Sequence, residues 1–168
     1  MRRVSFVIAL APLFLLGALS HAQLNDVTEQ NKAVARAAFL EYLNHRDFDG
    51  FEAIHTKDFV KHYNNRQAED LEQEMKDARG QYVASSDLTF TLNWMVAEGD
   101  KVAVCFTSRG TQDGSFSGMP ATGKKYEVSA MTVWRFRDGK IAEEWVYFNE
   151  LELYRQLGVI KDPGTPAH

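Results

Sequence analysis

The sequence predicts an α+β fold in which helices come first and a run of long strands follows. Before residue 85 the apolar residues recur at helical spacing, and from residue 88 onward they alternate with polar residues. Asp138-Gly139 separates two of the alternating segments and is typical of a two-residue hairpin turn. Because long sheets twist, this sheet can curl into a cone. We therefore expect a cone-shaped, curved antiparallel sheet with three N-terminal helices covering one end and a pocket open at the other.

Three segments carry the helical pattern. In the first, residues 26–44, the apolar residues recur at i, i+3, i+4 and i+7 and place Tyr42 on the apolar face. Asp26, followed three residues later by Glu29, resembles a capping box and predicts that the helix begins there. Two further helices are predicted at residues 48–55 and 69–82.

The strands are predicted from alternation with a period of two. In residues 88–96 the alternation puts Trp94 and Val96 on the same face as Leu88. The other strands are predicted at residues 58–63, 101–111, 126–136 and 140–148, and a short closing helix is predicted at 151–157.

The first 22 residues have the pattern of a signal peptide. Arg2 and Arg3 precede an apolar stretch, and Ser20-His21-Ala22 places small residues at the −3 and −1 positions of a cleavage site. The apolar stretch is shorter than the roughly 20 residues of a spanning helix, although an uncleaved anchor is the alternative. We expect cleavage after Ala22, a secreted or periplasmic location, no stable membrane association after cleavage, and one domain over residues 23–168.

Composition excludes several classes of function. The 168 residues carry a formal net charge of −4 and no basic stripe, so nucleic acid is not an expected partner. Cys105 is the only cysteine, so no intramolecular disulfide can form and packing must hold the fold. The spacings typical of metal ligands, of a serine nucleophile and of a nucleotide-binding loop are missing, so we expect no metal and no cofactor.

Several segments resemble the SnoaL-like polyketide cyclases, also called ester cyclases, of the nuclear transport factor two-like superfamily, which has a cystatin-like fold. This resemblance implies a cone-shaped α+β barrel, often a homodimer, that needs no cofactor and closes a polyketide ring by intramolecular aldol condensation. The matching segments are Asn44-His-Arg-Asp47, Asp58-Phe-Val-Lys-His62, Arg109-Gly-Thr-Gln-Asp-Gly-Ser-Phe116, Gly118-Met-Pro-Ala-Thr-Gly123, Arg137-Asp-Gly-Lys-Ile-Ala-Glu-Glu-Trp145 and Gln156-Leu-Gly158.

The sequence departs from the family at two positions. Asn149 stands where the family has an acid/base aspartate, and Gln112 stands where the family has a histidine in the pocket. Amides cannot exchange a proton near neutral pH, but they donate and accept hydrogen bonds. The family's proton-transfer residues therefore cannot be carried over, whereas a pocket with Gln112 and Asn149 as substrate-binding residues can.

The resemblance and strand alternation together predict the rest of the site. If Asn149 faces the cavity as the family aspartate does, then Tyr147, Trp145 and Glu143 lie on the same side of the strand. Trp145 and Tyr147 would form substrate-binding walls, together with Tyr42 of the first helix.

Two residues are candidates for moving the proton. Glu143 would be the only carboxylate on that face, and the alternative is that it is paired with a cation or exposed to water. His62, which matches the histidine of the family's first strand motif, is the second candidate because histidine titrates near pH 6.5. The alternative for His62 is a structural residue at a strand end.

Three functions remain open from the sequence. The chain could be a cofactor-free cyclase or lyase that acts on a small apolar carbonyl compound, with His62 and Glu143 as catalytic residues. It could instead be a binding protein that holds such a ligand without converting it. The third function is a structural dimer with a vestigial pocket.

Overall fold

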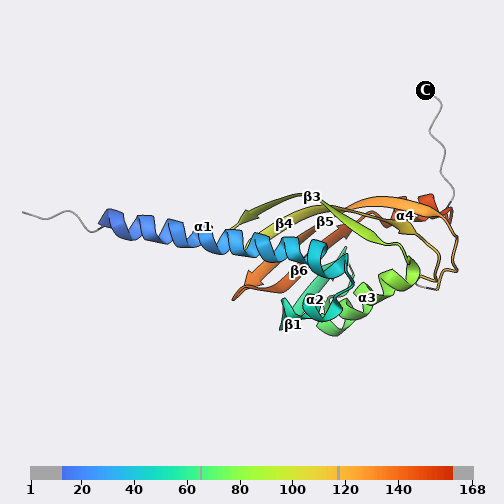
Figure 1. The fold of residues 1–168 in the computed structure, drawn as a ribbon, viewed down its shortest axis with the longest axis horizontal. Coiled ribbons are helices and arrows are strands. Elements are labelled where there is room, and N and C mark those ends of the chain that lie inside the picture. Colours follow the sequence, from blue (N-terminus) through green and yellow to red (C-terminus); the bar gives the residue numbers. More distant parts are fainter. Residues whose placement is uncertain (1–12, 65, 117, 161–168) are drawn as a thin grey trace, which may run out of the picture.

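A curved sheet of six strands, with helices packed against its concave face, is the architecture of residues 13–64, 66–116 and 118–160, which the computed structural model describes (Figure 1). The strand order is β2-β1-β6-β5-β4-β3. Neighbouring strands are antiparallel apart from β1 and β6, which run parallel. The strands are β1 His55–Tyr63, β2 Glu69–Asp70, β3 Thr89–Glu98, β4 Lys101–Thr111, β5 Lys125–Arg137 and β6 Lys140–Phe148. The expected α+β class with a curved sheet is confirmed, and the parallel pair is an addition to it.

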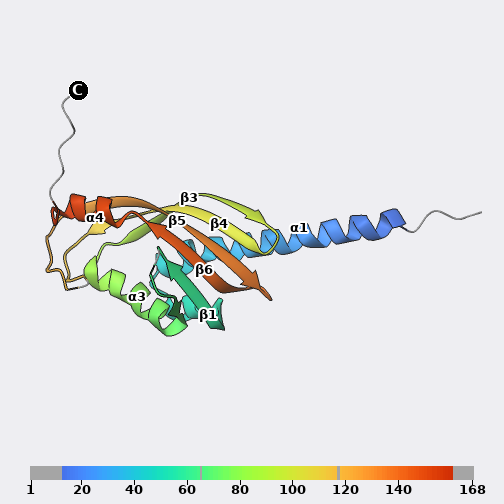
Figure 2. The ribbon, with the colours of Figure 1, turned by 180° about the vertical axis from the view of Figure 1, so that it is seen from behind.

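The helices lie at both ends of the sheet. The first, α1, is continuous with a π-helical segment and projects beyond the sheet, whereas α4 lies at the opposite end (Figure 2). None of the helices in the described ranges is both long and apolar enough to cross a membrane. The helices are α1 Leu13–Ala37, the π-helical segment Ala38–Leu43, α2 Phe48–Ala53, α3 Leu71–Ala84 and α4 Glu150–Leu157.

The predicted start of the first helix at Asp26 is wrong. The chain is already helical from Leu13, so the backbone N–H groups near Asp26 are bonded within the helix. The Asp26 carboxylate instead accepts a hydrogen bond of 3.1 Å from the Gln30 side chain. Of the predicted signal peptide, residues 1–12 lie outside the described residues, and residues 13–22 belong to α1.

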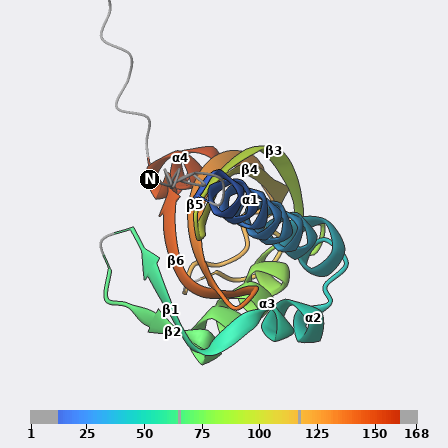
Figure 3. The ribbon, with the colours of Figure 1, turned by 90° about the vertical axis from the view of Figure 1, so that its left-hand side faces the viewer.

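The other helices begin at capping side chains. Asp47 accepts a hydrogen bond from the backbone N–H of Gly50 at the start of α2, and Asp70 accepts one from Gln73 at the start of α3. Such caps satisfy backbone donors that have no partner within the helix. The Asp70 cap fixes the start of α3, the helix that faces the concave side of the sheet (Figure 3).

A hairpin turn and a bulge in β3 set the direction of the side chains around them. Asp138 and Gly139 have φ values of 52° and 74°, as the predicted two-residue hairpin turn requires. In β3 the register shifts between Leu92 and Trp94, which indicates a bulge. The expectation that Trp94 and Val96 share the buried face of Leu88 is therefore wrong, because both are exposed, at 47% and 60%.

Candidate functional site

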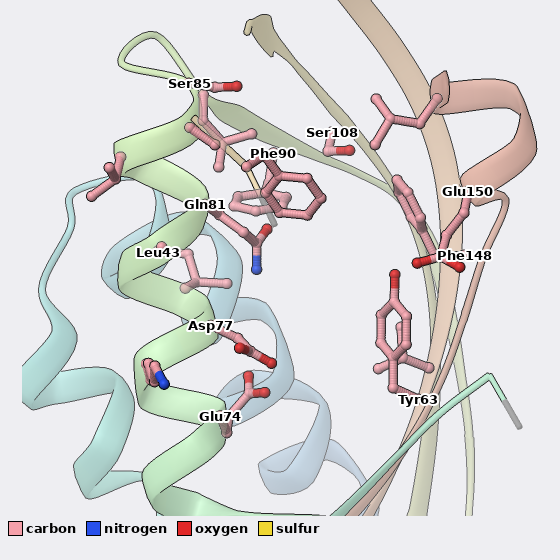
Figure 4. Close-up of a pocket in the computed structure, with 18 of the residues that line it drawn as sticks. Leu43, Tyr63, Glu74, Asp77, Gln81, Ser85, Phe90, Ser108, Phe148 and Glu150 are labelled. Carbon is pink, nitrogen blue, oxygen red and sulfur yellow. The ribbon is translucent and has the colours of Figure 1, made fainter. Parts of the chain in front are cut away.

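A cavity of about 640 Å³ lies between α3 and the concave face of the sheet (Figure 4). Leu43 and the α3 side chains of Glu74, Asp77 and Gln81 form one wall, and Tyr63, Phe148 and Glu150 form the opposite wall. A cavity of this size can hold a small organic molecule. It has an aromatic end and a charged end.

The aromatic end is built by residues of three strands and the π-helical segment. Phe39 stacks on Trp134, with ring centroids 5.4 Å apart, and lies 4.7 Å from the ring of Phe106. Phe90 contacts both Phe39 and Phe106 edge to face. These four residues line the cavity, so they offer a flat apolar surface to a ligand.

Lys61 is the centre of the charged end. Its Nζ lies 2.6 Å from Glu74 Oε2 and 3.1 Å from Asp77 Oδ2. A third carboxylate, that of Glu69, lies 2.9 Å away. Burial is the largest single effect on Lys61 and would lower its pKa, but the carboxylates of Glu74, Glu69 and Glu144 together outweigh burial and raise that pKa. Lys61 therefore remains an ammonium ion whose charge is shared by three carboxylates.

Glu144 is a fourth carboxyl group at this end, and no ion pair to it is found among the described residues. Its Oε1 accepts a hydrogen bond of 2.7 Å from the hydroxyl of Thr132. Burial raises the pKa of Glu144 to about 7, and the negative charge of Glu74 adds to the rise. The Thr132 hydroxyl and the Lys61 ammonium oppose the rise less strongly. Glu144 is thus a cavity-lining carboxyl that can hold or release a proton near neutral pH.

A tyrosine and an ion pair form part of the wall opposite α3. Arg66 pairs with Glu150 at 2.5 Å and lies over the ring of Tyr63, 4.9 Å from its centroid. Burial raises the pKa of Tyr63, so this phenol keeps its proton and can donate a hydrogen bond.

The predicted placement of Glu143, Trp145 and Tyr147 in the cavity is corrected by the structure. In β6 the cavity is lined by the alternate set, Glu144 and Val146, and Phe148 at the end of the strand. The prediction counted back from Asn149, but β6 ends at Phe148 and Asn149 has left the strand conformation. Side chains alternate along a strand, so a count that starts beyond its end assigns every residue to the wrong face.

The predicted catalytic pair lies on the convex face of the sheet. His62 Nε2 and Glu143 Oε1 are 3.0 Å apart, and the His62 ring stacks on Trp145 with centroids 5.4 Å apart. Arg135 also binds Glu143, at 2.8 Å. The structure brings His62, Glu143 and Trp145 together, but not with the cavity. Catalysis by His62 and Glu143 stays a prediction, and the cavity does not contribute to it.

Asn149 caps a helix. Its side chain accepts a hydrogen bond of 3.1 Å from the backbone N–H of Glu152, the third residue of α4. The residue is exposed and does not line the cavity. The structure therefore places Asn149 as the N-cap of α4, and its expected role in binding the substrate stays a prediction.

Gln112 lines the cavity, but its side-chain amide is already hydrogen-bonded to the backbone of the protein. Its Nε2 donates to the carbonyl oxygens of Gly114 and Pro120, at 2.7 and 3.1 Å. Its Oε1 accepts from the backbone N–H of Thr122 at 2.7 Å. With an exposed fraction of 2%, the amide holds together the loop between β4 and β5.

Tyr42 belongs to the core rather than to the cavity. It packs against the core cluster, and a Cβ atom at Gly50 would lie 2.6 Å from its ring. The close approach of α2 therefore requires glycine at position 50, and Tyr42 supports that contact. Tyr42 does not line the cavity, and its expected substrate contact stays a prediction.

The sequence reasoning missed the charged cluster. Lys61 lies two residues after the buried Phe59 in β1, which puts both on the same face, and this alternation could have found it. Glu74 directly precedes Met75 of the apolar stripe in α3, and its burial depends on Lys61 arriving from another element. Across the described ranges, acidic, histidine and cysteine side chains form no group of three that could hold a metal ion.

The fold and the cavity define a class of cone-shaped α+β proteins with a cavity for a small molecule. The chain matches the family model of the SnoaL-like polyketide cyclases over residues 33–157, and it belongs to this family. The resemblance predicted from the sequence motifs is thereby confirmed. No curated protein sequence matches the chain.

Solved structures agree with this assignment. AclR from Streptomyces galilaeus, provisionally described as a hydroxylase, is 26% identical, with a TM-score of 0.73 over 80% of this chain and 99% of AclR. IdmH from Streptomyces antibioticus, provisionally described as a polyketide cyclase, is 27% identical, with a TM-score of 0.65 over 75% of this chain and 97% of IdmH. A SnoaL-like protein from Jannaschia sp. CCS1, 23% identical, has the same fold with a TM-score of 0.74 over 80% of this chain and 96% of that protein.

Proposed function

We propose that this protein is a cofactor-free acid/base enzyme that acts on a small apolar carbonyl compound, and that Glu144 moves the proton. The observation that carries the proposal is the position of Glu144, a buried carboxyl at the junction of the charged and aromatic ends of the cavity. A general base is most effective when its pKa lies near the working pH, and the pKa of Glu144 is raised to about 7.

The reaction type follows from the family and from the cavity. The Glu144 carboxylate takes a proton from the carbon next to the ligand carbonyl, and the electron pair of that C–H bond moves toward the carbonyl oxygen to form an enolate. The enolate carbon then bonds to a second carbonyl carbon of the same molecule. The oxygen of that second carbonyl takes the proton back from Glu144. This aldol ring closure consumes no oxidant, reductant or other reactant.

The charged cluster supports this role of Glu144. Since Glu74, Asp77 and Glu69 share the charge of Lys61, Glu144 is not fixed as an anion by a direct ion pair. The nearby Lys61 ammonium still limits the cost of ionising Glu144 in the cavity. The balance allows both the protonated and the ionised form to be populated.

Hydrogen exchange of a model ketone tests the proposal. The full-length chain is incubated with 2-tetralone in D₂O, and deuterium uptake next to the carbonyl is followed by proton NMR. We expect Glu144→Gln to lower the catalysed rate by about 100-fold or more, because general-base catalysis contributes about 10²–10⁴-fold. The matched control, Glu143→Gln, should stay within about twofold of the native rate, and so should the double variant His62→Ala/Glu143→Gln. If exchange survives in Glu144→Gln but disappears in the double variant, the result would contradict the role of Glu144 and support catalysis by His62 and Glu143 on the convex face.

A non-catalytic ligand carrier is the second candidate. It is favoured by the two amides at the family's pocket-histidine and acid/base positions, both of which make structural hydrogen bonds. If 2-tetralone binds to the native chain and exchanges no faster than in buffer, the carrier is the better account.

Export and self-association are further parts of the proposal. The Arg2-Arg3 start, the apolar stretch and Ser20-His21-Ala22 support a signal peptide cleaved after Ala22 and a secreted or periplasmic location. Mass spectrometry of the protein from the producing cells should then give Gln23 as the first residue. The exposed Trp94, Met131 and Tyr147 of the sheet support a homodimer, which sedimentation analysis can test.

A further inference from the structure

The indole N–H of Trp134 has no hydrogen-bond partner among the described residues, although the residue is only 2% exposed. A tryptophan N–H can donate but cannot accept, and buried tryptophans usually find an acceptor. Leaving a buried donor unpaired is unfavourable because it has lost its hydrogen bonds to water. An orphaned donor in a cavity wall is therefore an indication of an acceptor supplied by a ligand.

The position of Trp134 makes this donor relevant to the proposed chemistry. Trp134 lines the cavity, and its ring stacks on Phe39 at the aromatic end. Its indole N–H also acts on Glu144 as a nearby donor and lowers the pKa of that carboxyl, although the two groups do not reach the distance and angle of a full hydrogen bond. The orphaned donor and the proposed base are thus neighbours on the inner face of the sheet.

We propose that the Trp134 indole N–H binds the carbonyl oxygen of the ligand and stabilises the negative charge that this oxygen gains when Glu144 removes the adjacent proton. In an enolate the oxygen and the deprotonated carbon are separated by a single carbon atom. A base and an N–H donor that lie side by side can therefore reach both atoms of one ligand. Donors placed in advance where charge develops are among the strongest contributions to catalysis.

The proposal names a class of ligand and rests on the proposed function. The ligand is an aromatic or polycyclic ketone, whose apolar rings lie against Phe39, Phe90 and Phe106 while its oxygen points to Trp134. Ligands that have the same rings but no oxygen should bind without help from the N–H group.

A pair of matched ligands tests this inference independently of catalysis. Naphthalene provides the rings alone, and 2-naphthol adds an oxygen in the geometry of the enol of 2-tetralone. We expect the native full-length chain to bind 2-naphthol about tenfold more tightly than naphthalene, as measured from the fluorescence of the ligands. Trp134→Phe, which keeps an aromatic ring and removes the N–H, should abolish most of this difference. The control Trp145→Phe, on the convex face, should leave it unchanged.

A second variant separates the N–H group from the volume of the ring. Site-specific replacement of Trp134 by benzothienylalanine exchanges N–H for sulfur at nearly constant shape, and it should also abolish the preference for 2-naphthol. An undiminished preference in this variant would overturn the inference, even if Glu144→Gln still abolishes hydrogen exchange. Failure of the native chain to bind either ligand would instead contradict the proposed function, and the inference would fall with it.

Discussion

The two faces of this sheet hold the same kinds of side chain in different environments, as two pairs of neighbouring residues show. Lys61 and Glu144 are paired in register across β1 and β6 and face the cavity. The next residue in β1, His62, and the preceding residue in β6, Glu143, lie 3.0 Å apart on the convex face. Each face therefore carries one basic and one acidic residue from the same two strands.

The difference lies in the environment of the carboxyl groups. Burial has the largest single effect on the pKa of Glu143 and raises it, but the hydrogen bonds and charges of His62 and Arg135 together outweigh burial and lower that pKa. Glu144 has a hydrogen bond from the neutral Thr132 hydroxyl and no direct ion pair among the described residues, so burial and the charge of Glu74 dominate and raise its pKa. Adjacent glutamates thus acquire opposite properties, one fixed as an anion and the other able to exchange a proton. Both glutamates lie in the same family motif, so the motif alone does not distinguish the properties of the two carboxyl groups.

The largest expected effect comes from removing the basic residue on each face. Lys61→Met leaves the buried Glu74 and the partly buried Glu69 and Asp77 without their shared cation, so we expect the free energy of unfolding to fall by about 3–5 kcal/mol. The matched change on the convex face, His62→Asn, should lower it by less than about 1 kcal/mol. Urea denaturation at neutral pH measures both values. Equal losses in the two variants would remove the distinction between the faces.

The pH dependence of stability should have opposite signs for the two glutamates. Because the pKa of Glu144 is raised from 4.5 to about 7 in the folded state, that state binds the proton more tightly, and stability falls as the pH rises from about 4.5 to 7. Glu144→Gln should therefore gain up to about 3 kcal/mol relative to the native chain over this window.

The control for this prediction is Glu143→Gln. The pKa of Glu143 is lowered by folding, so its stabilising contribution is present at neutral pH and is lost on acidification. The difference in stability between native chain and Glu143→Gln should hence shrink as the pH falls. If both variants change in the same direction with pH, the contrast between the two carboxyls is wrong.

The smallest effects concern the two amides. Gln112→Ala removes three hydrogen bonds from a buried loop, and we expect a loss of about 2 kcal/mol. Asn149→Ala removes one exposed helix cap, and we expect about 1 kcal/mol. Thermal unfolding of both variants measures the order. A larger loss for Asn149→Ala would mean that the capped helix α4 matters more than the loop at the cavity.

Much of the fold could be predicted from sequence because local patterns determine it. The bounds of β4 and β6 agree with the alternation of apolar residues, and the hairpin turn at Asp138-Gly139 agrees with its dipeptide. The α+β order and the SnoaL-like family followed from segment order and motifs. These features depend on residues that are close together in the chain.

The site was predicted less well because it depends on distant residues and on single-residue shifts. Counting from Asn149, which caps a helix, reversed the two faces of β6. The bulge near Asn93 reversed the direction of Trp94 in the same way. The burial of Glu144 depends on the packing of α3, with Glu74, against the sheet, and no local pattern in the sequence specifies that contact.

The titration of Glu144 itself tests the central claim most directly. Glutamate labelled with ¹³C at the carboxyl carbon gives one NMR signal for each residue, and the signal missing in Glu144→Gln identifies Glu144. We expect this signal to titrate with a midpoint near pH 7, while that of Glu143 titrates below the ordinary range of glutamate. A Glu144 midpoint at or below the ordinary value would contradict the assignment of this residue as the proton carrier of the cavity.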